Sequence, residues 1–343
     1  MHILYVAPKY DYGDPNRGFS FEHHNFYDAL TRMGHDITYF DFVSEYQQRG
    51  KAAMNARLRD IAQTEKPDLL FCVLFEHELD IDTMRYISQC TDTVTFNWFC
   101  DDHWRFDNFS RHWAPAFNWV STTAASALPK YRRIGYTNVI KTQWACNHFL
   151  YRPSTSDPIY DVTFVGQPHG TRRQTIAAIR AAGIDVKTWG HGWESGRLTQ
   201  EEMIRVFSSS RINLNLSNAS TTGVGWARWL PWRRAPLPQQ IKGRNFEIPG
   251  CGGFVLTGMA ENLDEYYVPD REVSVFSDVD DLVAKVRFYL DHEPQRQQVA
   301  EAGYARTVAE HTYEKRFNEI FTIMGVVPRA PMGESRGVER ENP

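Results

Sequence analysis

A short stretch near residue 245 brings together side chains that could hold a phosphorylated sugar. Lys242, Arg244 and Glu247 are close neighbours in the chain, and Gly252 and Gly253 follow them just before an apolar run. Cations at this spacing can hold phosphate, and one carboxylate can accept hydrogen bonds from a sugar diol. Glycines let the backbone approach a ligand closely. The stretch therefore contains parts suited to a nucleotide that carries a sugar.

The backbone conformation of this stretch decides which charges face the same way. Lys242 and Arg244 share a face if the segment is extended, but not if it is helical. Glu247 follows Arg244 by one helical turn, so the alternative is a surface ion pair worth under about 1 kcal/mol. The glycines favour a ligand, because a merely solvated face would not need them. We expect the stretch and residues 254–257 to give a strand.

A second candidate anion site follows the apolar run at residues 161–166. Gly170, Arg172 and Arg173 lie where this expected strand leads into a helix. Free backbone N–H groups and the helix dipole favour negative charge at such a point, and the arginines add to it. The alternative is an ordinary turn with a solvated arginine pair. The loop matches neither the Walker A pattern nor GxGxxG.

A third candidate site follows the expected strand at residues 93–99. Asp101, Asp102 and His103 come directly after it, and such groups suit general-base work or the binding of acceptor hydroxyls. The alternative is that either aspartate caps the next helix. We do not expect a metal site here, since adjacent residues of an extended segment point to opposite faces.

Residues 221–238 interleave arginines with tryptophans, among them Trp229 and Arg233. Such a segment can bind single-stranded nucleic acid, stack on sugars, or close as a loop over a cleft. Arg17, in the loop after the first expected strand, is a further candidate to contact an acceptor or form part of a lid. The sequence leaves these alternatives open.

Short apolar runs alternate with helical patterns along most of the chain, which predicts an α/β fold with parallel sheets. The expected strands of the first half are residues 2–8, 36–41, 68–75, 93–99, 119–122 and 138–141. Those of the second half are residues 161–166, 186–190, 211–216, 254–257 and 273–276. The fold class is therefore two Rossmann-like, doubly wound domains that face a cleft.

A polar, proline-containing segment at residues 153–158 separates the two halves. We expect domains at residues 1–152 and 159–310, with a last helix at residues 311–325 that packs back on the first domain. The remainder, residues 326–343, is rich in proline, glycine and charge and is expected to be disordered. Ligands of parallel sheets lie at the carboxyl ends of the strands, so residues just after strands rank highest as site candidates.

Composition excludes several classes of protein. The formal net charge of −4 gives no general attraction to nucleic acid or membrane. The five cysteines are scattered without a CxxC pair, which argues against a disulfide framework or a zinc site and fits a reducing compartment. No apolar run approaches the roughly 20 residues of a membrane helix. We expect a cytoplasmic protein with no cofactor and no membrane span.

The motifs taken together resemble those of glycosyltransferases related to CgeB-type spore maturation proteins. The resemblance is carried by residues 240–247, 251–253, 311–317, 161–166 and 189–193, together with Gly170 and Arg172. It implies the GT-B architecture, with the nucleotide-sugar donor in the C-terminal domain and the acceptor facing the N-terminal one. It also implies that no metal ion is needed.

The resemblance assigns roles to single residues as well. Glu247 matches the glutamate that binds the donor ribose, and Arg172 matches the basic residue that binds the diphosphate. Lys242 and Arg244 would be further phosphate partners. Retaining members often carry another glutamate eight positions earlier, where this chain has Gln239. If the reaction inverts the sugar instead, Asp101 or Asp102 would be the base.

The sequence thus predicts transfer of a sugar from a nucleotide diphosphate sugar, with UDP favoured, to a hydroxyl group of a glycan, small molecule or protein. DNA ranks below these acceptors because of the acidic net charge. Two alternatives are a glycosyltransferase acting on modified DNA bases and a two-domain protein that binds a ligand without chemistry.

Overall fold

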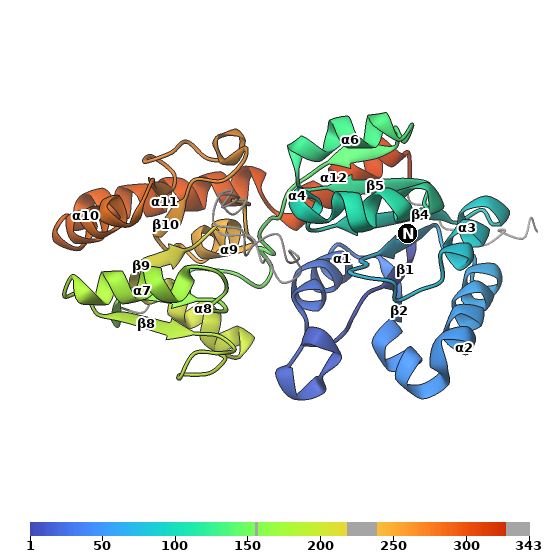
Figure 1. Ribbon diagram of the computed structural model, residues 1–343, viewed down its shortest axis with the longest axis horizontal. Coiled ribbons are helices and arrows are strands. Elements are labelled where there is room, and N and C mark those ends of the chain that lie inside the picture. Colours follow the sequence, from blue (N-terminus) through green and yellow to red (C-terminus); the bar gives the residue numbers. More distant parts are fainter. Residues whose placement is uncertain (155–156, 218–238, 327–343) are drawn as a thin grey trace, which may run out of the picture.

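Two α/β domains, each with a parallel sheet at its centre, lie side by side in the chain (Figure 1). The computed structural model describes residues 1–154, 157–217 and 239–326. The expected fold class is confirmed, because both halves alternate strands and helices and form separate sheets.

The N-terminal sheet has six strands in the order β2-β1-β3-β4-β5-β6, and every pairing is parallel. The strands are β1 (His2–Val6), β2 (Asp36–Phe40), β3 (Leu69–Cys72), β4 (Val94–Phe99), β5 (Trp119–Thr122) and β6 (Val139–Lys141). The helices are α1 (Asp28–Arg32), α2 (Phe42–Thr64), α3 (Ile81–Cys90), α4 (Asp102–Arg105), α5 (Arg111–Trp113) and α6 (Leu128–Arg133). A π-helical turn, His23–Tyr27, leads into α1.

The short apolar runs form buried strands because helices cover both faces of the sheet. On one face Leu4, Leu70 and Val120 pack with α2, α3 and α6. On the other face Tyr5 and Phe71 pack with α1 and with the last helix of the chain. All five of these strand residues are fully buried.

The C-terminal sheet has five parallel strands in the order β11-β10-β9-β7-β8. The strands are β7 (Tyr160–Val165), β8 (Val186–Trp189), β9 (Ser210–Asn215), β10 (Val255–Gly258) and β11 (Ser274–Phe276). The helices are α7 (Arg172–Ala181), α8 (Gln200–Ser208), α9 (Arg244–Gly250), α10 (Val279–Asp291) and α11 (Glu293–Glu310). Helices α7 and α10 share one core cluster, and α8 and α9 share another.

The stretch around residue 245 is the main departure from the expected elements. Residues Arg244–Gly250 form helix α9 rather than part of a strand, and only Val255–Gly258 extends into β10. Six of the seven residues of α9 are buried. The helix forms because Phe246 and Ile248 pack against Tyr267 and the linker residue Tyr151, whereas an extended segment would leave this apolar space empty.

Helix α12 (Tyr313–Met324) returns to the N-terminal domain, where Figure 1 shows it in red. Tyr313, Phe317, Ile320 and Phe321 lie on one face of this helix and join the cluster around β1 and β3. The side chain of Thr312 caps the helix by accepting a hydrogen bond from the Lys315 N–H.

The chain crosses between the domains twice, and the two crossings lie side by side. The Cys146 N–H donates to the His311 carbonyl at 2.9 Å, and the Tyr313 N–H donates to the Cys146 carbonyl at 3.0 Å. A Cβ atom at Gly250 would collide with the Cys146 sulfur, so helix α9 packs directly on this paired crossing.

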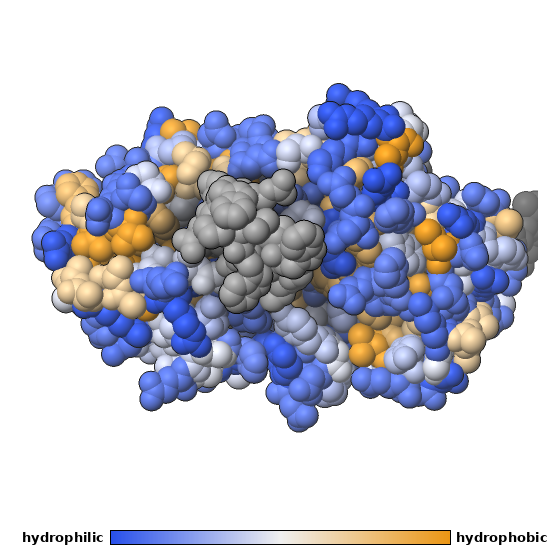
Figure 2. Space-filling view, in the orientation of Figure 1, coloured by the Kyte–Doolittle hydropathy of each residue, from blue (hydrophilic) through white to orange (hydrophobic). Residues whose placement is uncertain are grey.

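Among the described residues, no helix is both long and apolar enough to cross a membrane. Most of the face shown in Figure 2 is hydrophilic, and its apolar residues form small, separate patches. These observations agree with an α/β fold that buries its apolar side chains on the two sheets.

Candidate functional site

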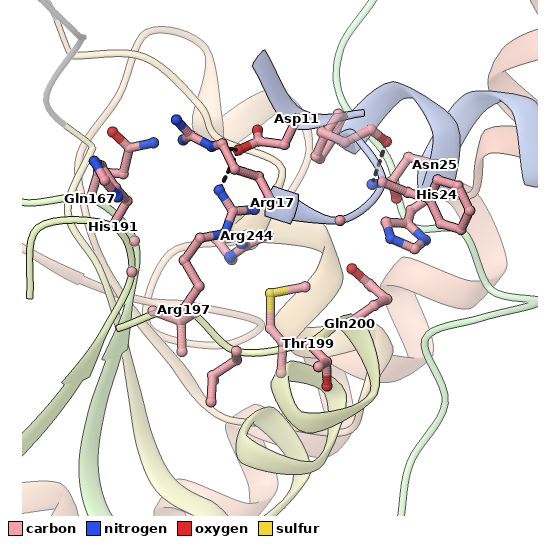
Figure 3. A pocket seen from close by; sticks show the side chains of 18 of the residues that line it. Asp11, Arg17, His24, Asn25, Gln167, His191, Arg197, Thr199, Gln200 and Arg244 are labelled. Carbon is pink, nitrogen blue, oxygen red and sulfur yellow. Dashed lines mark hydrogen bonds and ion pairs between the residues drawn. The ribbon is translucent and has the colours of Figure 1, made fainter. Parts of the chain in front are cut away.

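A cavity of about 720 Å³ opens between the two domains, at the edge where strands β7 and β8 end. Its N-terminal wall comes from the loop after β1 and the turn before α1, and its C-terminal wall from the loops after β7 and β8, the start of α8 and the first residue of α9 (Figure 3). The lining residues are Asp11, 15–19, Phe21, His24, Asn25, Tyr151, 165–167, 190–191, 197–200, Met203 and Arg244. This is the position expected for a ligand of parallel sheets.

A buried amide network fixes the turn that carries Lys242 and Arg244. The Asn245 side chain accepts from the Lys242 N–H at 3.0 Å and from the Asn215 amide at 2.7 Å. It also donates to the Thr257 hydroxyl at 3.1 Å. Because Asn215 ends β9 and Thr257 lies in β10, the turn is tied to two neighbouring strands. Fully satisfied buried networks of this kind hold a single geometry.

Glu247 is completely buried at the junction of both domains and the linker. It forms an ion pair with Arg244 and accepts a hydrogen bond from the Tyr151 hydroxyl at 2.7 Å. Asn25, from the N-terminal domain, donates to the same carboxylate oxygen at 3.3 Å. The pairing of Arg244 with Glu247 is thus buried, not a solvated surface pair.

Lys242 lies opposite the N-terminal domain. Burial lowers the pKa of its ammonium group to about 8, although the nearby Asp101 carboxylate works against this shift. Among the described residues, its amine has no hydrogen-bond or ion-pair partner within bonding distance. A partly buried ammonium group with no direct partner among the described residues can take up an anion.

Arg172 begins helix α7 and is nine-tenths buried. Its guanidinium group donates to the backbone carbonyls of Gln167 at 2.9 Å and Leu216 at 2.8 Å. Burial, and next the positive charge of Arg244, lower the pKa of Arg172 to about 10. Arg173 is exposed, donates to the Gly192 carbonyl and lies over the ring of Trp193.

The predicted glycines have different roles. Gly170 has a φ of +59° in the turn before α7, on the side of the sheet that faces the cavity. Gly252 and Gly253 precede β10 and therefore lie at the opposite edge of the sheet, against Pro153 and Phe207. These two glycines allow close packing behind the site, and they are not among the residues that line the cavity. Their role in donor binding stays a prediction.

Asp101, Asp102 and His103 separate in the structure. Asp101 faces the C-terminal domain, where its carboxylate accepts a hydrogen bond from the Gln240 amide at 3.3 Å. His103 lies 3.5 Å from Glu261 of the C-terminal domain, and burial lowers its pKa. Both therefore lie at the domain interface.

Asp102 points into the N-terminal domain instead. It is 2% exposed and accepts hydrogen bonds from the hydroxyl groups of Ser110 and Tyr131. Burial raises its pKa despite these bonds. The Asp102 carboxylate already joins three elements inside the domain, so its action on an acceptor stays a prediction that this geometry does not favour.

Arg17 lines the cavity, in agreement with its place after the first strand. Trp229 and Arg233 lie outside the described residues, as does the rest of the Trp/Arg-rich segment on which a DNA acceptor was based. The expected disordered tail also lies outside them, except for its first residue, the buried Val326.

Several residues of this region were not among the candidates predicted from the sequence. Tyr151 and Asn25 hold Glu247, and Asp11 and Arg197 meet across the cavity. Glu22 is 8% exposed, and burial, with the nearby Asp11 and Asp101 carboxylates, raises its pKa to about 7. Asp11 and Arg197 carried a usable signal, since each lies in the loop after an expected strand.

Comparisons with known proteins agree with this geometry. Residues 172–322 match the family described as glycosyl transferase-like. The spore protein CgeB of Bacillus subtilis (strain 168) is 22% identical over 209 residues, which span 57% of this chain and 64% of CgeB. The match therefore covers less than two thirds of that relative.

Several solved structures have the same fold over nearly the whole chain. Anabaena Alr3699/HepE in complex with UDP-glucose gives a TM-score of 0.66 at 12% identity, over 95% of this chain and all of that one. Sucrose-phosphate synthase from Thermosynechococcus elongatus gives a TM-score of 0.63 at 10% identity, over 95% of this chain and 97% of that one. At such identities the likeness shows the fold.

Proposed function

Since the chain has the GT-B glycosyltransferase fold, carries a glycosyl transferase-like domain at residues 172–322 and is a distant homologue of CgeB, we propose that it transfers a sugar from a nucleotide diphosphate sugar to a hydroxyl acceptor. A UDP-sugar is the favoured donor, because Alr3699/HepE, which has the same fold, is described in complex with UDP-glucose.

One observation carries this proposal: three cations from two separate loops gather at the carboxyl edge of the C-terminal sheet. Arg172 comes from the turn after β7, and Lys242 and Arg244 from the turn before α9. They lie near enough for Arg244 to lower the pKa of Arg172, and for Arg172 to lower that of Lys242. Like charges are held together at a cost, and a diphosphate would remove that cost.

The donor would then lie along the C-terminal wall of the cavity. Its diphosphate would meet Lys242 and Arg244, with Arg172 behind them and the N–H groups near Gly170 adding partial positive charge. Arg173, stacked on Trp193, would contribute charge at longer range. These cations would stabilise the charge that develops on the departing diphosphate. The reaction would need no metal ion.

The ribose would bind at Glu247. Both carboxylate oxygens already accept hydrogen bonds, so a ribose diol must replace one of the present donors. Asn25 makes the longest of these bonds and belongs to the other domain, so it is the donor to be replaced. Binding of the nucleoside would therefore be linked to the position of the N-terminal domain.

Asp101 would act on the acceptor as the general base. It lies at the end of β4, faces Gln240 and Lys242, and is partly exposed at the domain interface. A carboxylate at this position can take the proton of an attacking hydroxyl group. His103, with its lowered pKa, is largely neutral at pH 7 and would help to position the acceptor. The acceptor would be a glycan, small molecule or protein.

The test is a panel of UDP-, GDP- and TDP-sugars, in which released diphosphate and calorimetric affinity are measured for each donor. We expect turnover of at least one UDP-sugar and binding of UDP. Binding of UDP-sugars without any turnover would favour a non-catalytic binding protein. Absence of binding by every nucleotide would refute the proposal. Addition of EDTA should leave the rate unchanged.

Lys187→Ala serves as the matched control for Lys242→Ala in the same panel. Lys187 is an exposed lysine of β8 that pairs with Asp185. We expect weaker UDP binding for the Lys242 variant alone.

We further propose that the protein works in the cytoplasm, because all five cysteines are free thiols.

A further inference from the structure

Two arginines from opposite domains converge on a single carboxylate oxygen at the wall of the cavity. The Nε atom of Arg17 lies 2.9 Å from Oδ2 of Asp11, and Arg197 pairs with the same oxygen. All three residues line the cavity, where Figure 3 shows them beside Arg244. Arg17 and Asp11 belong to the N-terminal domain and Arg197 to the C-terminal domain.

The charges in this group do not balance. Two guanidinium groups face one carboxylate, and Arg244, the other arginine of the cavity lining, already pairs with Glu247. The group of Asp11, Arg17 and Arg197 therefore carries one excess positive charge. The three side chains are between 22% and 36% exposed, so solvent and a ligand can reach them.

The loop that carries Asp11 and Arg17 is built to hold them in place. Tyr12 has a left-handed backbone with a φ of +52°, and its ring lies 4.3 Å from the Arg17 guanidinium carbon. The Asp11 N–H donates to the Gly18 carbonyl at 3.0 Å and closes the loop. A non-glycine residue in that conformation persists only where the surroundings enforce it, which is typical of ligand-binding loops.

A carboxylate held by two guanidinium groups has the geometry with which arginines bind phosphate or carboxylate groups of ligands. We propose that Arg17 and Arg197 form a second anion subsite, that Asp11 occupies it when no substrate is bound, and that its ligand is the phosphate or carboxylate group of an anionic acceptor. This inference rests on the proposed glycosyl transfer and specifies its acceptor class.

The position of the group favours the acceptor over the donor as the source of that anion. The donor diphosphate already has Lys242, Arg244 and Arg172 on the C-terminal domain. Two of the three residues of the second subsite come instead from the N-terminal domain, on the acceptor side. An acceptor anion that replaces Asp11 would still be held by one arginine from each domain, and would therefore favour the closed arrangement of the domains.

The test measures binding of glycerol 3-phosphate and of glycerol to the full chain, each in the presence of saturating UDP, by calorimetry. The variants are Asp11→Asn, Arg17→Gln and Arg197→Gln. Arg205→Gln is the matched control, because Arg205 is an exposed arginine of α8 in the same domain as Arg197. Thermal melting of each variant identifies any that fails to fold.

We expect Asp11→Asn to tighten glycerol 3-phosphate binding about fivefold or more, since the internal competitor loses its charge. Arg17→Gln and Arg197→Gln should each weaken glycerol 3-phosphate binding about tenfold. The affinity for glycerol should be the same for every variant as for the wild type. Arg205→Gln should behave as the wild type does.

Three results would overturn the inference. If Asp11→Asn tightens UDP binding but leaves glycerol 3-phosphate unchanged, the two arginines serve the donor diphosphate. If the arginine variants match Arg205→Gln, the group is only a bridge between the domains. If glycerol 3-phosphate does not bind while UDP does, the acceptor is not anionic. Failure of the proposed function itself would appear differently, as absence of UDP binding to the wild type.

Discussion

The two domains differ in several of the charges that they bring to the region where they meet. Arg172, Lys242 and Arg244 gather on the C-terminal domain, whereas Asp11, Glu22 and Asp101 gather on the N-terminal domain. Cations suit a leaving diphosphate, and carboxyl groups suit the proton of an attacking hydroxyl. Two sheets of the same design can thus supply different chemistry through the residues that follow their strands. In the proposed reaction, the C-terminal domain would bind the diphosphate and the N-terminal domain would supply the base.

Removal of the carboxylate at Asp101 should cause the largest effect. We expect Asp101→Asn to lower the rate of UDP release from UDP-glucose by about 10²- to 10³-fold, because the attacking hydroxyl or water loses its base. The affinity for UDP should change less than about twofold, since the residue lies on the acceptor side. Steady-state assays and calorimetry measure the two quantities.

Asp107→Asn is the control, because Asp107 is 70% exposed and pairs with Lys130. If Asp101→Asn released UDP at the wild-type rate, the acid–base role proposed for Asp101 would be contradicted.

Glu22 tests the cost of burying a carboxyl group in the N-terminal domain, close to other carboxylates. Its pKa is raised from 4.5 to about 7, so between those values the folded protein holds a proton that the unfolded chain has lost. The free energy of unfolding should therefore fall as the pH rises through this window, by at most about 3 kcal/mol. Glu22→Gln should reduce this slope. Urea unfolding between pH 4.5 and pH 8 measures it, and an unchanged slope would contradict the prediction.

Lys242 tests the C-terminal domain. Its pKa is lowered to about 8, so the ammonium charge is present below that pH and lost above it. We expect the affinity for UDP to fall as the pH rises past about 8, and Lys242→Met to remove this dependence and weaken binding about 10- to 30-fold at pH 7. Calorimetry from pH 6.5 to pH 9.5 reports both. An equal pH dependence in the variant would show that another group controls binding.

A contact that crosses between the domains should have the smallest effect. Glu261 of the C-terminal domain accepts from the N–H of Ser126 at 3.0 Å and from its hydroxyl at 3.1 Å. Ser126→Ala removes the second bond only, so we expect a loss of about 0.5–1 kcal/mol in the free energy of unfolding. Ser88→Ala provides a comparison, because the Ser88 hydroxyl donates to the Ala116 carbonyl within the N-terminal domain. A loss well above 1 kcal/mol would mean that this contact largely holds the domains together.

Most of the fold could be predicted from the sequence, because buried parallel strands are short apolar runs and the helices carry regular stripes. Helix α9 could not, because its seven residues are too few to show a stripe and its stability comes from packing against Tyr151 and Tyr267. Tertiary contacts overrode the local pattern there.

Less of the site could be predicted. The rule that ligands lie after strands agrees with the position of Arg17 at the cavity, whereas Arg244 also lines the cavity although its stretch was expected to be a strand. It could not distinguish Asp101 from Asp102, since adjacent carboxylates point in different directions and only the positions of Ser110 and Tyr131 decide which one is buried. Nor could it pair Asp11 with Arg197, which are far apart in the chain and meet only where the domains meet.

The return of α12 to the N-terminal domain has a consequence for the order in which the protein is made. Tyr313, Phe317 and Ile320 complete one face of the N-terminal sheet, yet they are translated after the entire C-terminal domain. During synthesis that face stays open until α12 has emerged from the ribosome. We therefore expect the emerging N-terminal domain to need protection by chaperones, and the C-terminal sheet to be the first finished unit.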